Sequence, residues 1–359
     1  MLLILLAVVL LFSGPLGAIE LKTNRTKALV PLSEIIPGGP PPDGIPAIDA
    51  PKFVGPKEAD GWLNPKEPVL AVEVNGEARA YPLQILTWHE IVNDTVGGRP
   101  VCVTYCPLCN SGIVFDRKLG DRLLDFGTSG MLYKSDLVMY DRQTHSLWSQ
   151  MEGRAIVGDL AGTKLSWLPS NTIAYGEWKA LFPRGKVLSR ETGHRRAYGL
   201  NPYDGYDEPN LPPFLFFDQV DRRLPPKERV VGVVIGPSAK AYPFSVLAKR
   251  RVLTDTVDGE PLVIFHRPGT LSALDHNLIA QSRDVGATAV FRPVLDGKPL
   301  TFEPTETGFK DRETGSLWSL LGRAYQGPLA GKTLRPIIHV DAFWFAWAAF
   351  QPKTQVYQP

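Results

Sequence analysis

The 359-residue chain repeats itself, and the repeat limits the folds that are open to it. Pro65-Lys66-Glu67 recurs as Pro226-Lys227-Glu228, and the match continues without a gap at an offset of 161 residues. Farther on, the string from Asp141 to Ser149 recurs from Asp311 to Ser319. Because the match extends over about 125 residues in each copy, we expect two copies of one structural unit that share an interface.

Each copy carries the signals of short strands joined by turns. The 33 prolines and 33 glycines favour many turns and extended connections over a helical bundle. A short helix is expected over 83–90, and aromatic residues at helical spacing predict a helix near the end of each copy, over 172–182 and 340–350. The predicted fold is therefore α+β and β-rich, with two pseudo-symmetric copies of one mainly antiparallel β unit, each ending in an aromatic helix.

The sequence divides into five parts. Residues 1–18 are mostly apolar and end in small residues, which is typical of a secretory signal peptide. Residues 19–64 are rich in Pro and Gly, and scattered apolar residues there predict an extended arm packed on the body. Residues 65–192 form the first copy and residues 226–359 the second. Between them, 193–225 is an apolar connector that we expect to strap one half to the other.

The signal segment predicts where the protein is located. An exported chain is secreted or periplasmic, or is anchored if the signal segment stays uncleaved. No later segment offers the roughly 20 consecutive apolar residues that a membrane-spanning helix needs. With 39 basic and 37 acidic residues, the composition gives no electrostatic reason to expect a nucleic-acid partner, and the sequence indicates no other partner.

All three cysteines lie in one short stretch of the first copy. Cys106 and Cys109 form a C-x-x-C pair flanked by β-branched and aromatic residues, which predicts the tight turn of a β-hairpin. Two thiolates on one side of such a turn supply half of a tetrahedral metal site. Cys102 is expected to belong to the core, because four residues of extended chain separate it from Cys106 by ~13 Å.

The second copy is an internal control for this motif. At the aligned positions it has Lys249-Arg250-Arg251, Val263, Arg267 and Thr270 where the first copy has Trp88-His89-Glu90, Cys102, Cys106 and Cys109. If these side chains were needed to build the unit, the second copy would need them too, so their joint presence favours a site over a scaffold role. By the same logic, Asp141-Arg142 and Asp311-Arg312, which occur in both copies, are predicted to be structural ion pairs.

We therefore predict a transition-metal site. Its ligands are His89, Cys106 and Cys109, and thiolate and imidazole ligands in an exported protein suit copper or zinc. The predicted binding residues around it are Trp88, Glu90, Tyr105, Tyr133 and His145. The first copy also carries a segment, 130–138, without a counterpart in the second, and such an insertion is a natural wall or lid for the site.

Four strings carry a resemblance to a known family. They are DGIPAID at 43–49, WHEIVND at 88–94, TYCPLC at 104–109 and SDLVMYDR at 135–142. Together they resemble the exported prokaryotic proteins grouped as domain of unknown function 3179 (DUF3179), and the similarity covers most of the chain after residue 18. The resemblance implies no activity. Asn110 stands where Gly is expected in such proteins, and because Asn tolerates a positive φ, the turn is expected to survive.

Three classes of function remain open. A metal-binding protein uses Cys106, Cys109 and His89 with a fourth ligand. A thiol oxidoreductase uses the same cysteines, with His89 as an imidazolium that stabilises the thiolate. A ligand-binding module holds an extracellular ligand on an aromatic surface that includes Trp88, while the cysteines form an inert bridge. No Ser-His-Asp order, P-loop or dinucleotide fingerprint is present, so the sequence does not decide whether the protein is an enzyme.

Overall fold

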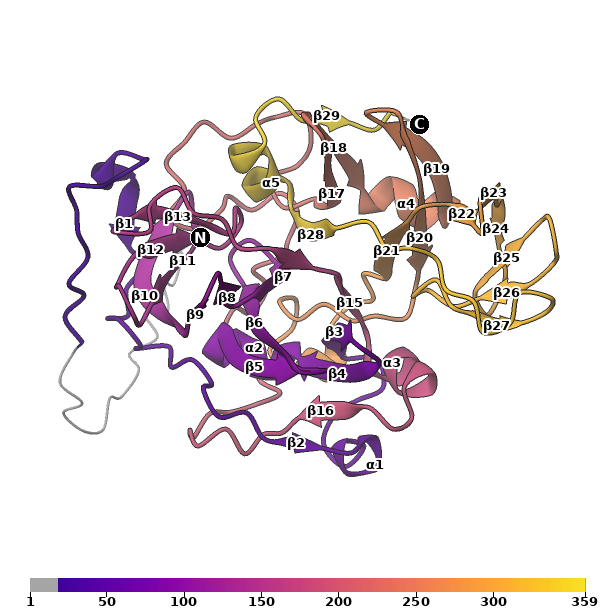
Figure 1. The fold of residues 1–359 in the computed structure, drawn as a ribbon, viewed down its shortest axis with the longest axis horizontal. Helices are drawn as coiled ribbons and strands as arrows, with labels where there is room; N and C mark the ends of the chain where they lie inside the picture. The colour runs from indigo at the N-terminus through magenta and orange to yellow at the C-terminus, as the bar shows by residue number, and fades with distance from the viewer. Residues whose placement is uncertain (1–18, 359) are drawn as a thin grey trace, which may run out of the picture.

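The computed structural model describes residues 19–358, so the predicted signal peptide at 1–18 lies outside the described residues. Within residues 19–358, no helix has the length and apolar character needed to cross a membrane. The chain is rich in strands, and most strand pairs are antiparallel (Figure 1). The prediction of a β-rich fold with mainly antiparallel sheets is confirmed.

Residues 19–192 contribute three larger sheets and one short hairpin. In spatial order, the first sheet contains β15 (Ser170–Ala174), β3 (Pro68–Val74), β4 (Glu77–Pro82), β16 (Lys186–Leu188) and β2 (Phe53–Val54). The second contains β14 (Trp167–Leu168), β7 (Ser111–Asp116), β6 (Arg99–Cys106) and β5 (Ile91–Val96). The third contains β1 (Ile35–Pro37), β10 (Phe126–Tyr133), β11 (Asp136–Asp141), β12 (Leu147–Ser149) and β13 (Arg154–Val157). The short hairpin is β8 (Lys118–Leu119) and β9 (Arg122–Leu123), and the helices are η1 (Leu32–Glu34), α1 (Pro56–Ala59), α2 (Leu83–His89) and α3 (Tyr175–Leu181).

Residues 226–358 form a similar set of elements. One sheet contains β28 (His339–Phe343), β17 (Arg229–Ile235), β18 (Ser238–Pro243) and β29 (Gln355–Val356). Another contains β19 (Val252–Val257), β20 (Glu260–Arg267) and β21 (Ala287–Phe291). A further sheet contains β24 (Phe302–Pro304), β25 (Phe309–Asp311), β26 (Leu317–Trp318) and β27 (Ala324–Gln326). The short hairpin is β22 (Val294–Leu295) and β23 (Lys298–Pro299), and the helices are α4 (Phe244–Arg250), η2 (Ile279–Gln281) and α5 (Trp344–Phe350).

The elements follow the same order in both halves. Shifted by 161 residues, the bounds of β3, β4, α2, β5 and β6 fall on those of β17, β18, α4, β19 and β20. The sheet order β15-β3-β4-β16 has its counterpart in β28-β17-β18-β29. The helices expected over 83–90, 172–182 and 340–350 are α2, α3 and α5. The last two begin later than predicted, because the preceding residues extend β15 and β28 along the neighbouring strands.

The repeated turn is not held by the predicted ion pairs. Asp141 accepts hydrogen bonds from the Thr144 hydroxyl and the Trp148 indole, both at 2.9 Å, and Asp311 makes the equivalent bonds in the second half. Arg142 instead pairs with Asp43 of the arm. Asp141 and Asp311 therefore stabilise the turn by accepting hydrogen bonds from neighbouring side chains. In the first half, Arg142 forms its salt bridge with the arm instead of with Asp141.

The two halves share their hydrophobic core. One buried cluster combines Leu70 of the first half with Trp344 of the second, and a second cluster is mixed in the same way. The backbone amide of Phe343 in β28 donates to the carbonyl of Cys109 at 2.9 Å. The turn that carries the cysteine pair is therefore fixed against the second half.

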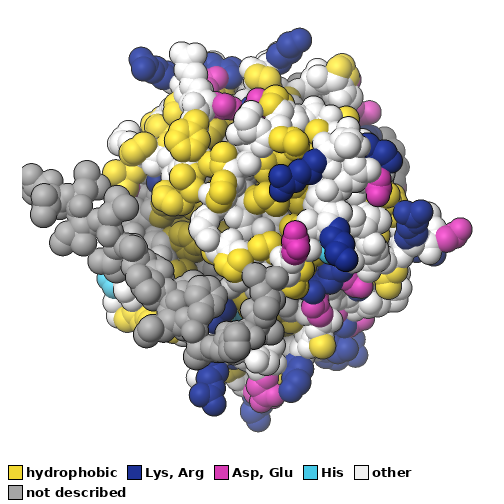
Figure 2. All heavy atoms as spheres, turned by 90° about the vertical axis from the view of Figure 1, so that its left-hand side faces the viewer, with side chains coloured by type: hydrophobic (Ala, Val, Ile, Leu, Met, Phe, Trp, Pro, Cys, Tyr) yellow, Lys and Arg dark blue, Asp and Glu magenta, His cyan; other side chains and the backbone are white. Residues whose placement is uncertain are grey.

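The arm packs on the first half, as expected from its apolar residues. Its strand β1 pairs with β10, and the backbone of Ile48 bonds with Ile91 and Asn93 of β5 at 2.9 Å. Figure 2 shows the side of the molecule on which β1 lies, with hydrophobic side chains gathered over its upper part and Lys and Arg side chains around the edge and on the right-hand part of the face.

The connector contacts both halves. On the first half, the Trp88 indole donates to the Leu200 carbonyl at 3.2 Å. On the second, the Asn201 amide donates to the Asn277 carbonyl at 2.8 Å. These contacts place the connector across the two halves, close to the end of α2.

Candidate metal centre

Cys106 and Cys109 lie at the turn between β6 and β7. The register pairs Cys106 with Ser111, which leaves Pro107 to Asn110 as the turn. Asn110 has a φ of 52°, a left-handed conformation that Asn adopts more readily than most residues. Its side-chain oxygen accepts a hydrogen bond from the Tyr105 hydroxyl at 3.1 Å. The predicted hairpin and turn are thus confirmed.

A second hairpin, β10–β11, brings Asp136 to the cysteines. Its turn residues Lys134 and Ser135 both have positive φ, which a tight two-residue hairpin turn requires. The Ser135 carbonyl lies 3.6 Å from the Cys109 Sγ, which donates to it. This hairpin contains the segment 130–138 predicted to be an insertion. β10 and β11 have 8 and 6 residues against 3 each in β24 and β25, so the insertion lengthens this hairpin. Its residues Ser135 and Asp136 lie at the cysteines.

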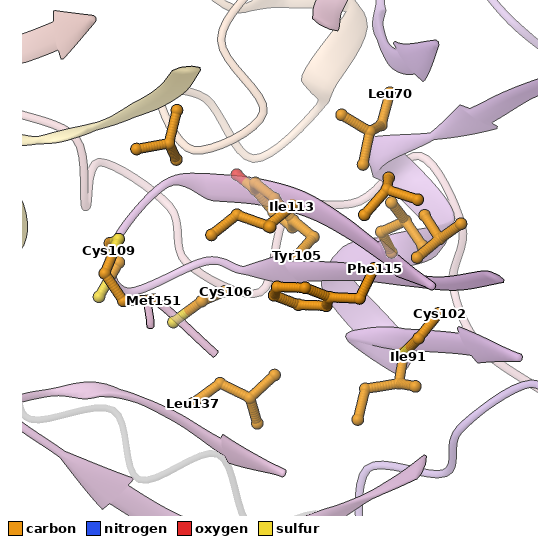
Figure 3. Packing of buried hydrophobic residues seen from close by; sticks show 14 of the residues in the cluster. Leu70, Ile91, Cys102, Tyr105, Cys106, Cys109, Ile113, Phe115, Leu137 and Met151 are labelled. Carbon is orange, nitrogen blue, oxygen red and sulfur yellow. The ribbon is translucent and has the colours of Figure 1, made fainter. Parts of the chain in front are cut away.

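The three side chains meet closely. The Sγ atoms of Cys106 and Cys109 and a carboxylate oxygen of Asp136 all lie within 4.8 Å of one another, and all three residues are buried. The cysteines are free thiols. In Figure 3, Cys106 and Cys109 lie at one end of the hairpin near Met151, whereas Cys102 lies at the other end. Cys102 is fully buried in the sheet, so its assignment to the core is confirmed.

Burial has the largest effect on the pKa values of Cys106, Cys109 and Asp136. It raises the pKa of both thiols, and the charge of Asp136 raises them further. Burial also raises the pKa of Asp136 to about 7, against the opposing effect of the Met151 amide, which donates to Oδ2 at 2.9 Å. The other oxygen, Oδ1, is buried and has no hydrogen-bond partner within residues 19–358. The thiols of Cys106 and Cys109 oppose the rise in the pKa of Asp136 as neighbouring donors, although neither lies at a normal hydrogen-bonding distance from Oδ1. The site therefore combines three acidic groups in close contact.

Glu90 is a second buried acidic residue, and its backbone carbonyl accepts a hydrogen bond at 2.8 Å from the amide of Tyr105, the residue before Cys106. Glu90 follows α2 in a left-handed conformation with a φ of 58°, and only 8% of it is exposed. Burial raises the pKa of Glu90 to about 8, and the charge of Asp136 adds to the rise. Glu90 is in turn one of the charges that raise the pKa of Cys106. The predicted binding residue Glu90 is thus tied through its backbone to the strand that ends at Cys106.

The structure does not bring His89 into this group. Its Nδ1 lies 2.7 Å from the Pro46 carbonyl, and its Nε2 lies 2.6 Å from the Tyr198 hydroxyl. Because a carbonyl only accepts, Nδ1 carries the proton and Tyr198 donates to Nε2. Burial lowers the pKa of His89 to about 4, so the ring is neutral and both nitrogens are engaged. His89 is directed to the arm and the connector, whereas the next residue, Glu90, lies by the cysteines.

The comparisons with known proteins bear on these residues. A family profile described as "Protein of unknown function (DUF3179)" matches residues 42–354 of the chain. The chain belongs to the DUF3179 family. The match includes both halves, the connector and every residue of the candidate centre. No curated protein and no solved structure matches this DUF3179 chain.

The other predicted binding residues of this DUF3179 protein lie around the group or away from it. Trp88 donates to the connector, and Tyr105 donates to Asn110 within the turn. Tyr133 packs in a separate small cluster, and the ring of His145 accepts a hydrogen bond from the backbone of the arm at 2.9 Å. Each of these side chains has a structural contact that accounts for its position.

Asp136 is the candidate ligand that the sequence analysis missed. A lone aspartate at the start of a strand belongs to no metal-binding motif. Two signals point to it nonetheless: it lies in the segment 130–138 that only the first half carries, and the residues that follow it, 137–140, are all apolar or aromatic. An acidic residue that begins a buried strand is unusual enough to mark a site.

Proposed function

We propose that this DUF3179 protein binds a transition-metal ion through the thiolates of Cys106 and Cys109 and the carboxylate of Asp136. The observation that carries the proposal is the close group itself: the ligand atoms lie within 4.8 Å of one another, and the buried Asp136 Oδ1 has no partner at hydrogen-bonding distance within residues 19–358. A buried acceptor left without a partner costs about 1–3 kcal/mol. A cation bound there satisfies the acceptor and stabilises both thiolates against the effect of burial.

Zinc fits these ligands better than copper. Zn²⁺ takes both Cys sulfur and Asp oxygen in tetrahedral sites. Cu(I) prefers sulfur ligands, so the Asp136 carboxylate argues against it. Met151, which belongs to the same buried cluster, offers copper a third sulfur atom. We therefore propose zinc, with Cu(I) as the competitor against which it is tested.

Thiol–disulfide exchange is the competing function, since the two sulfur atoms are close to each other. Two features oppose it. Burial raises the pKa of both thiols, whereas a reactive exchange thiol has a lowered pKa. The cysteine pair also lies between β6 and β7 rather than at the start of a helix, where the helix dipole stabilises a thiolate.

Elemental analysis of protein purified without chelator tests the proposal. We expect about one zinc per chain, and loss of that metal in Cys109→Ser and Asp136→Asn. Cys102→Ser and His89→Gln are the matched controls and are expected to keep the metal. Absence of stoichiometric metal, with no uptake of Zn²⁺ or Cu(I) by the reduced protein, contradicts the proposal. Catalysis of disulfide exchange by that metal-free protein supports the competing function instead.

We also propose that the halves are pseudo-symmetric copies of one unit and that the second has no metal centre. The contacts between halves are reciprocal, since β7 packs against β28 and its counterpart β21 packs against β15. A small cavity between the halves is lined by aligned residues of both copies, including the pairs Leu83 with Phe244 and Asn110 with Leu271. Arg267, which occupies the position of Cys106, forms a salt bridge across the halves to Glu177 at 2.9 Å.

A further inference from the structure

Gln150, the residue after β12, joins the two hairpins of the centre. Its backbone amide donates to the carbonyl of Leu137, the residue after Asp136, at 3.1 Å. Its side chain bonds with Thr104 of β6 and Ser111 of β7, the strands on either side of the cysteine turn. We propose that Gln150 is a positioning residue of the metal centre, which holds Asp136 against the cysteine pair and thereby favours zinc over Cu(I). This inference rests on the proposed metal site and names what sets its metal preference.

The hydrogen bonds of the Gln150 side chain fix it in one orientation. The Thr104 hydroxyl donates to the Ile113 carbonyl at 2.7 Å, so its oxygen accepts from Gln150 Nε2 at 3.0 Å. Nε2 also donates to the Ser111 carbonyl at 3.2 Å, and the Ser111 hydroxyl donates to Oε1 at 3.0 Å. Thr104, Ser111 and Gln150 are all 0% exposed. A buried polar network whose members all have partners holds the strands that it joins rigidly.

The network lies directly beside the candidate ligands. Thr104 and Cys106 are two residues apart in β6, so their side chains lie on the same face of the sheet, and Ser111 is the residue opposite Cys106 in β7. On the other hairpin, the amide of Met151 donates to Asp136 Oδ2 at 2.9 Å. The segment after β12 is therefore bonded to β11 through its backbone and to β6 and β7 through one amide side chain. This link sets the separation between the thiols and the carboxylate.

The second half has apolar residues at all three positions of the network. By sequence offset and strand register, the aligned pairs are Thr104 with Phe265, Ser111 with Ala287 and Gln150 with Leu320. The three apolar residues are buried in one hydrophobic cluster. The unit therefore folds without the polar network. The strand β25 also lacks the part of β11 that carries Asp136, so the network and the ligand that it positions occur together in the first half.

Holding the carboxylate in place affects zinc more than Cu(I). Zn²⁺ takes sulfur and oxygen ligands together, whereas Cu(I) prefers sulfur. Without the link, the thiols stay in their turn, because the bond between Tyr105 and Asn110 lies within that turn. The carboxylate, in contrast, loses the side chain that ties its hairpin to the cysteine hairpin. Loss of Gln150 is therefore expected to weaken zinc binding and to leave Cu(I) binding nearly unchanged.

Competition titrations of the reduced protein with chromogenic chelators for Zn²⁺ and for Cu(I) test the inference. We expect Gln150→Leu, the residue found in the second half, to weaken Zn²⁺ binding by about 10–100-fold, the usual effect of losing a partner that orients a ligand. We expect Cu(I) binding to change by less than about threefold, because sulfur ligands dominate it. Gln84→Leu is the matched control. Gln84 is also a buried, hydrogen-bonded glutamine, but its partners are Glu67 and Arg190, so both affinities are expected to stay unchanged.

A second variant separates positioning from a folding defect. Gln150→Leu leaves the Ser111 hydroxyl without its acceptor, whereas Thr104→Val, Ser111→Ala and Gln150→Leu together replace the network with apolar groups, which is nearly neutral for stability. The triple variant is expected to unfold cooperatively in urea and to show the same loss of zinc with the same Cu(I) affinity.

Each contrary result has a distinct meaning. Zinc affinity in the triple variant equal to that of the unmodified protein overturns the inference, and so does an equal loss of both metals. A triple variant without a cooperative transition also overturns it, because the network would then be a requirement of the fold. If the unmodified protein binds neither metal, the proposed metal site itself fails.

Discussion

Asp136 and His89 show what decides the role of a single side chain in this molecule. Both are buried and polar, but the two nitrogens of His89 have partners, whereas one oxygen of Asp136 has none within residues 19–358. The cysteine pair could be predicted, because residue type and turn chemistry are local properties. The orientation of the His89 side chain could not be predicted. It is determined by contacts with Pro46 of the arm and Tyr198 of the connector, which are distant in sequence.

Buried histidines make the stability of the fold depend on pH. His266 is buried, and burial lowers its pKa to about 4, below its usual value of about 6.5. Between these values the unfolded chain binds the proton and the folded chain does not. Stability is therefore lost as the pH falls from about 6.5 to about 4, by about 1.4 kcal/mol per pH unit for one such group. His89 acts in the same direction.

Urea unfolding between pH 7 and pH 5 measures this effect. His266→Gln is expected to lose less stability than the unmodified protein over that interval, because one of the two buried histidines is gone. His276→Gln, at an exposed position, is the matched control and is expected to follow the unmodified protein. Equal pH dependence in His266→Gln and the unmodified protein contradicts the expectation.

At the level of elements, two hairpins and the connector build the centre. The β6–β7 hairpin was predictable, because its turn residues and flanking β-branched residues are adjacent in sequence. The β10–β11 hairpin was visible as an insertion, but its approach to the cysteines depends on how two sheets pack. The connector then packs on the β10–β11 hairpin and on α5: the Ser135 hydroxyl donates to the Phe214 carbonyl at 2.5 Å, and Phe216 packs on Phe345 with ring centroids 5.2 Å apart.

Loosening the connector is expected to expose the cysteine pair. Phe216→Ala removes a partly buried ring that packs on α5. Alkylation of Cys106 and Cys109 in metal-free protein should therefore accelerate by at least about tenfold, which corresponds to about 1.4 kcal/mol, less than the roughly 3–5 kcal/mol lost with a fully buried Phe. Peptide mapping by mass spectrometry measures each thiol separately, and Cys102 in the sheet is expected to stay unreactive. Phe217→Ala is the matched control, because that neighbouring ring is 79% exposed and little packing is lost. Equal rates in the two variants would show that the connector does not limit access.

For the whole molecule, the repeat predicted the order of the elements but not how the halves fit together. An offset of 161 residues relates strand bounds in the two halves, because each unit is specified by its own sequence. The shared core could not be predicted from the sequence of either copy alone. It forms because apolar residues such as Leu70 and Trp344, which are distant in sequence, pack into one cluster.

This shared core predicts that the second half does not fold by itself. Expressed alone, residues 226–359 lose the partner surface of the mixed clusters and expose apolar side chains to water. We expect an insoluble product or one without a cooperative thermal transition. A soluble fragment that melts cooperatively would show that the halves are independent domains.

The proposed centre is defined by the atoms around one metal ion, and X-ray absorption at the zinc edge measures them directly. For zinc-loaded protein, the account predicts two sulfur neighbours at about 2.3 Å together with oxygen neighbours at about 2.0–2.2 Å, the latter from Asp136 and the fourth ligand. Asp136→Asn is expected to lose zinc, and Cys102→Ser is expected to keep both the zinc and its shell of neighbours. A first shell without sulfur, or one of sulfur alone, contradicts the account.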